Sequence, residues 1–235
     1  MIKKIRIYIV IGLYFMFIYF FVINPYFVNS SIDVISAILF LNFNTFERLG
    51  IDKFDMQYLI MFILFYHIII YPKLSELSNN SSFVSMSLHK LGKRKQLFHI
   101  FSDNFKYVIM IYFYILLCAV IFETIVSILN NSVFEYKILI RIAIYLIKYL
   151  SFIFTVISVN QIIGIIKEYP YFILQSYFLF VILLMNDMIL DLSIITLSSS
   201  VINEFFRLII TVSIEGIVII ITVYKFLKIG EIYND

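Results

Sequence analysis

Four ionisable side chains lie inside long apolar stretches of this 235-residue sequence. They are Glu123, Lys148, Asp187 and Glu215, and each belongs to a different stretch. A charge held deep in lipid costs at least about 2.5–3.5 kcal/mol, so such residues usually face a helix bundle or a wet cavity. Side chains from four helices can line one polar chamber. These residues are therefore our candidates for a polar path through a membrane.

Each of the four also has a simpler interpretation. Glu123 and Asp187 are near the ends of their stretches, where water can solvate them, and a lysine such as Lys148 can extend its amine towards the interface. Glu215 stands beside Gly216 near the middle of its stretch, so solvation explains it less well. For Glu215 we expect either a functional role or a role in packing.

The apolar stretches themselves indicate a membrane protein. Hydrophobic residues make up 63% of the chain and charged residues only 14%, which a soluble domain of this length cannot bury. Six stretches are expected to be helical spans, at about 7–28, 56–71, 107–130, 142–166, 171–190 and 208–224. The second is short and should be closed by Pro72. We expect an all-α, polytopic protein whose residues 1–235 form a single transmembrane domain.

The distribution of lysine and arginine predicts the orientation. Segments on the side of the N-terminus hold twelve basic residues, and segments on the opposite side hold five. Basic residues favour the cytoplasmic side, so both chain ends are expected there. This arrangement, with a composition typical of an AT-rich genome, predicts a multi-pass protein of a bacterial cytoplasmic membrane.

The loop 73–106 is the only sizeable cytoplasmic element that this topology leaves. Three apolar residues recur in it at helical spacing, namely Val84, Leu88 and Leu91. Gly92 can end that short helix in a left-handed conformation, and Lys93, Arg94 and Lys95 then begin the helix that continues into the third span. Two interpretations remain open: a basic loop held to anionic lipid, or a helix that docks on a cytoplasmic partner.

The segment Lys90-Leu91-Gly92-Lys93-Arg94-Lys95-Gln96-Leu97 resembles a pattern in permease subunits of bacterial ABC transporters of the type-2 exporter class. That pattern reads basic, apolar, glycine, any residue, basic. The resemblance implies a coupling helix that includes Val84, Leu88, Lys90, Leu91, Gly92, Lys93 and Arg94 and enters a groove of a separate ATPase subunit. Many family members carry a longer amphipathic segment before the first span, whereas only six residues precede it here.

The resemblance also implies partners and a function. The chain would pair with a second, identical or different, permease chain and form the path for a small peptide or amphipathic substrate. It would bind no cofactor, because ATP and Mg²⁺ belong to the ATPase subunit. The alternative is a membrane-bound bacteriocin immunity or accessory protein without a transport cycle.

No catalytic or metal-binding motif is present in the sequence. There is no H-E-x-x-H and no glycine-rich phosphate loop, and the paired glutamates of one class of membrane protease are missing. Cys118 is expected to be a buried apolar residue, and His67 a contact between helices. We therefore expect neither an enzyme nor a nucleic-acid partner, with an intramembrane enzyme as the third possibility.

Overall fold

The computed structural model of the protein is helical throughout the part that it describes. It describes residues 8–13, 56–79, 92–129, 136–166, 171–190, 196–197 and 200–229. The long helices are α4 (Met56–Asn79), α6 (Lys93–Leu129), α7 (Tyr136–Ile166), α8 (Tyr171–Leu190) and α9 (Val201–Ile229). Residues 8–13 are also helical, and these ranges contain no strand. The expected all-α class is confirmed.

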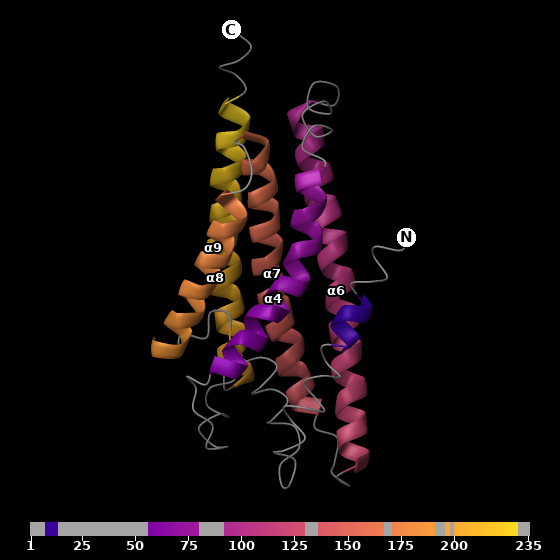
Figure 1. Ribbon diagram of the computed structural model, residues 1–235. Coiled ribbons are helices and arrows are strands. Elements are labelled where there is room, and N and C mark those ends of the chain that lie inside the picture. The colour runs from indigo at the N-terminus through magenta and orange to yellow at the C-terminus, as the bar shows by residue number, and fades with distance from the viewer. Residues whose placement is uncertain are drawn as a thin grey trace.

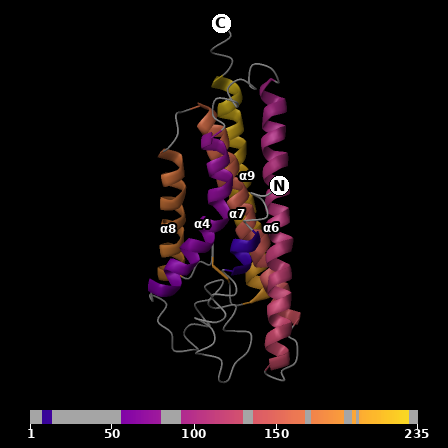
Figure 2. The same cartoon turned by 45° about the vertical axis from the view of Figure 1, so that its right-hand side comes forward.

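The helices alternate in direction along the chain. In Figures 1 and 2, α4, α7 and α9 run one way through the bundle, while α6 and α8 run the opposite way. The beginning of α6 therefore lies at the same end of the bundle as the ends of α7 and α9 (Figure 1). Such alternation is what successive membrane crossings with short connections require.

Three of the described helices are long and apolar enough to cross a bilayer. The qualifying segments are Lys93–Ile121, Leu139–Ile163 and Val201–Lys228. They overlap the spans expected at 107–130, 142–166 and 208–224. The apolar helical segments Phe62–Lys73 and Tyr177–Asp187 are shorter. Most of the first expected span, 7–28, lies outside the described residues. Membrane-protein character thus rests on the three long helices.

α7 is the central helix of the bundle. It packs against α4, α6, α8 and α9, and 67% of its spanning segment is buried, compared with 11% of that of α9. α9 touches α7 along a narrow stripe and turns its remaining isoleucine, valine and phenylalanine side chains outward. A helix with one narrow buried face is suited to lipid on its other sides, because lipid solvates apolar side chains.

Aromatic side chains join α4 to α8. The rings of Tyr66 and Phe180 stack with their centroids 3.8 Å apart. Beside this stack, Nδ1 of His67, the residue after Tyr66, forms a 2.6 Å hydrogen bond with the hydroxyl of Tyr177, one turn from Phe180 on α8. His67 is thus a contact between helices, as expected. Cys118 packs against the apolar core, although it is only partly buried.

The expectation that Pro72 closes its helix is wrong. α4 continues through Pro72 as far as Asn79. A proline inside a helix lacks the N–H that would bond to the carbonyl four residues earlier, and its ring pushes the preceding turn apart. Tyr107 of α6 donates its hydroxyl to the carbonyl of Ile69, 2.6 Å away, in that disturbed turn. Support from a neighbouring helix is how membrane helices tolerate proline.

The expected break at Gly92 is present. Gly92 has a φ of 72°, in the left-handed region that favours glycine. α6 begins at the next residue, Lys93, and the amide of Gln96 donates to the Gly92 carbonyl at 3.2 Å. The helix expected before this break lies outside the described residues, as do Val84, Leu88, Lys90 and Leu91.

Candidate functional site

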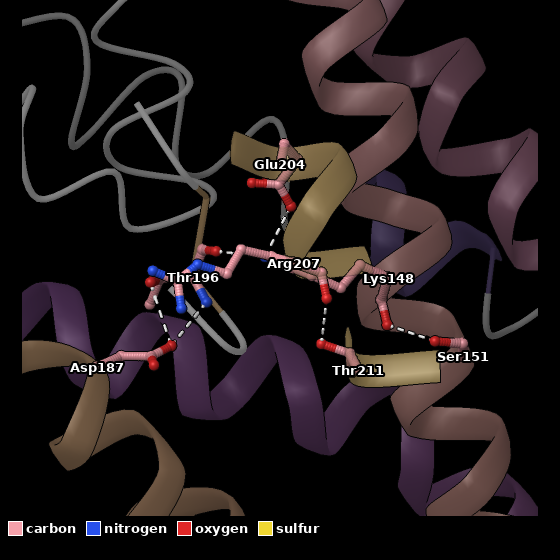
Figure 3. A network of polar contacts seen from close by, with 7 residues as sticks. All are labelled: Lys148, Ser151, Asp187, Thr196, Glu204, Arg207 and Thr211. Atoms are coloured by element: carbon pink, nitrogen blue, oxygen red, sulfur yellow. Dashed lines mark hydrogen bonds and ion pairs between the residues drawn. The ribbon is translucent and has the colours of Figure 1, made fainter. Parts of the chain in front are cut away.

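A buried ion pair joins α7 to α9. Nζ of Lys148 lies 2.7 Å from Oε1 of Glu204, and neither side chain is exposed. The two residues are located near the end of the bundle where α9 begins (Figure 3). A buried charge that loses its counter-charge costs several kcal/mol. The pair therefore fixes α7 and α9 to each other at this level.

Thr196 connects the same lysine to Asp187 of α8. Lys148 donates a second hydrogen bond, of 2.8 Å, to the carbonyl oxygen of Thr196. The amide and hydroxyl of Thr196 both lie close to Oδ2 of Asp187, at 3.0 and 3.2 Å. Figure 3 shows these groups converging from α7, α8 and the segment before α9. The main chain at Thr196 thus bridges a buried cation and a buried carboxylate.

Arg207 adds a second cation to this network. It is one turn beyond Glu204 on α9, and its charge acts on Lys148 against the attraction of Glu204 and Asp187. Two carboxylates and two cations balance one another in the network. Low dielectric strengthens such attractions but also makes any unmatched charge expensive. We call Lys148, Asp187, Thr196, Glu204 and Arg207 the charge cluster.

A serine cap positions Glu204. The amide of Asn203 donates to Oγ of Ser200 at 3.2 Å, and the amide of Glu204 donates to the Ser200 carbonyl at 3.0 Å. Serine is favoured at this position because its oxygen satisfies an amide that the first helical turn leaves without a partner. The cap allows α9 to begin at Val201, whereas the sequence analysis placed the span at 208–224.

This early start explains why Glu204 and Arg207 were not predicted as site residues. Residues 191–207 were expected to form an outer loop, where charged residues need no partner. A signal was present, because Glu204, Thr211 and Glu215 are spaced by seven and four residues and thus share one helix face. All three are buried against α7 in the structure.

Glu215 lies apart from the charge cluster, halfway along α9. Its side chain is 7% exposed, and its Oε1 has no hydrogen-bond partner. Its carboxylate contacts the hydroxyl of Ser151 on α7. That hydroxyl donates to the main-chain carbonyl of Lys148 at 2.8 Å. Glu215 is thus a buried acid whose polar neighbour also bonds to a main-chain carbonyl.

The structure brings together two of the four residues proposed for a polar path. Lys148 and Asp187 meet through Thr196, and Glu215 occupies the same α7–α9 interface at another level. Glu123 belongs to α6, but its side chain is outside the described residues. Lys148 does not extend to the interface, since its amine is buried against Glu204 and Thr196.

A second polar contact joins α6 to α7 towards the opposite end of the bundle. Nδ2 of Asn104 donates to Oγ of Ser158 at 3.1 Å and to Oε1 of Gln161 at 2.8 Å. Asn160 instead bonds within its own helix, to the carbonyl of Val156. Gln161 thus has a structural role between helices, because amide side chains join helices in apolar surroundings.

The described residues hold no group of three or more histidine, cysteine, aspartate or glutamate side chains that could bind a metal ion. Comparison with known proteins gives no family: no family model, no curated protein and no solved structure matches the chain. Any functional inference therefore depends on the residues and their geometry.

Proposed function

We propose that this chain is the permease subunit of an ABC exporter in the cytoplasmic membrane of a bacterium. In this proposal it crosses the membrane six times with both ends inside. It pairs with a second permease chain and forms the path for a small peptide or amphipathic substrate. A separate ATPase subunit binds and hydrolyses ATP.

The break at Gly92 is the observation that carries this proposal. A left-handed glycine directly before a helix that starts with Lys93 and Arg94 gives the chain a sharp basic elbow. The elbow lies at the end of the bundle where α9 finishes (Figure 1), and the last two turns of α9 carry the exposed Lys225 and Lys228. Basic residues at one end favour a cytoplasmic location, where an ATPase could dock.

The charge cluster fits the same proposal. It lies at the other end of the bundle, which is the outer end in this topology, and it joins α7, α8 and α9. Four of its five residues are buried and Arg207 is partly buried, so the cluster would keep the outer end closed in this conformation. Export would require α7 and α9 to separate there, with Lys148 leaving Glu204.

Co-purification with the ATPase tests the proposal. We expect Leu88→Asp to abolish the association, because burying an apolar side chain in a groove is worth about 1.5–3 kcal/mol and a charge reverses that gain. Lys93→Ser should weaken it only mildly, and more visibly at low salt, since rim charges mainly steer association. Gly92→Ala should also weaken it, because alanine is strained at a φ of 72°.

Retention of the ATPase by the Leu88→Asp variant would overturn the coupling-helix assignment. So would the reverse order of severity, with Lys93→Ser acting more strongly than Leu88→Asp, which a loop that only binds lipid predicts. Either result would favour the accessory-protein alternative.

A further inference from the structure

Among the described residues, Glu215 differs from the other buried acids because no cation pairs with it. Glu204 has Lys148 as a partner, and Asp187 accepts two hydrogen bonds from Thr196. The charges that act on Lys148 include those of Glu204, Asp187 and Arg207. No basic side chain in the described ranges forms a salt bridge with Glu215. One acidic group is therefore left over after the charge cluster is balanced.

The carboxylate of Glu215 lacks a hydrogen-bond donor. An ionised carboxylate only accepts hydrogen bonds, and a hydroxyl has a single proton to donate. The Ser151 hydroxyl contacts the Glu215 carboxylate, but it also donates to the Lys148 carbonyl at 2.8 Å, so its single proton serves two acceptors. Among the described residues, Oε1 of Glu215 has no hydrogen-bond partner. The missing group is a donor, and in an apolar bundle a positively charged donor fits best.

The surface of α9 is open at Gly216, the residue that follows Glu215. A Cβ atom built on Gly216 would meet no atom within 4 Å beyond its two chain neighbours and the backbone of its own helix. Gly216 adjoins Glu215 in sequence and follows it by about 100° around the helix. Glycine is a poor helix former, and alanine would fit here without a clash. The glycine therefore leaves a space on the helix surface that packing does not require.

We propose that Glu215 binds a cationic group of the transported molecule, a primary ammonium or a guanidinium, which enters past Gly216. This inference rests on the proposed function and specifies its substrate class as amphipathic molecules that carry a positive charge. An ammonium offers three donors and a guanidinium five, so either group supplies the donor that Oε1 of Glu215 lacks. The neighbouring apolar face of α9 would accept the apolar part of such a molecule.

Binding of octylammonium tests the proposal, with octanol as the uncharged probe of equal chain length. The full chain is reconstituted in nanodiscs and titrated calorimetrically, and the signal from empty nanodiscs is subtracted. We expect the chain to bind octylammonium more tightly than octanol. Glu215→Gln should weaken octylammonium binding by roughly tenfold to a hundredfold and leave octanol unchanged, because a hydrogen bond to a charged group is lost. Asp103→Asn, which alters an exposed carboxylate, should change neither.

Equal affinity of the wild type and the Glu215→Gln variant for octylammonium would overturn the proposal, as would equal binding of the two probes by the wild type. If the Glu215→Gln variant does not fold, octylammonium binding by the Gly216→Val variant tests the proposal instead. The added side chain has room in the structure and should weaken octylammonium binding by closing the access, whereas unchanged binding would refute the proposal. The assay needs no ATPase, so cation binding can hold even if no ATPase partner exists.

Discussion

The amine of Lys148 on α7 lies 2.7 Å from Oε1 of Glu204 on α9, with both side chains fully buried. The two residues are separated by more than fifty positions, and α8 comes between their helices in the chain. Their contact joins the most buried of the three spanning segments, in α7, to the least buried, in α9. Replacing either Lys148 or Glu204 alone would therefore leave the other charge buried without its counter-charge.

Lys148→Met should destabilise the protein by about 3–5 kcal/mol, because Glu204 is then buried without its counter-charge. Lys148→Met combined with Glu204→Leu should restore much of that loss, since two apolar side chains need no partner. The measurement is the free energy of unfolding in mixed micelles. Lys225→Met, which changes an exposed lysine, is the control and should have little effect. Additive effects of the two substitutions would show that the pair is not coupled.

Asp187→Ala should loosen the segment before α9. The amide and hydroxyl of Thr196 would lose their acceptor, at about 1–3 kcal/mol for each donor left buried. Asp187→Asn should be milder, because its amide oxygen can still accept. Hydrogen exchange at Thr196 reports the change directly. Protection as strong in the alanine variant as in the wild type would contradict this reading of the contact.

Asn104→Ala should weaken the contact between α6 and α7, because Ser158 and Gln161 each lose a donor. Hydrogen bonds between helices in a membrane contribute about 0.6 kcal/mol on average and up to about 1.7 kcal/mol. We expect a loss of stability within that range for each bond, measured by thermal unfolding in detergent. The exposed Asn203 provides a matched control. An Asn203→Ala effect as large as that of Asn104→Ala would argue against the inter-helix role.

Labelling of single cysteines tests the orientation. In a Cys118→Ala background, an impermeant thiol reagent added to whole cells should label residues 52 and 199 but not residue 93. The excess of basic residues beside Lys93 places it inside. Labelling at 93, or protection at both other sites, would contradict the six-span topology.

Local properties of the sequence were sufficient to predict the helical class and much of the helix layout. The expected start of the third helix at Lys93, the left-handed Gly92 and the bounds 171–190 agree with the structure. Each depends on a few consecutive residues: an apolar run, a glycine, a change from apolar to basic. Where a neighbouring helix intervened, prediction failed. α4 passes Pro72, and Tyr107 supports the disturbed turn from α6.

The tertiary structure alone decided which buried charges are matched. The sequence marks Lys148, Asp187 and Glu215 as unusual, but it does not tell that Lys148 pairs with Glu204 or that Glu215 has no cation. The free energy of transferring a helix into lipid is nearly the sum of the contributions of its consecutive residues, so a span can be predicted from a local stretch of sequence. Pairing depends on the rotation and relative height of helices far apart in sequence, which many small packing contacts determine together.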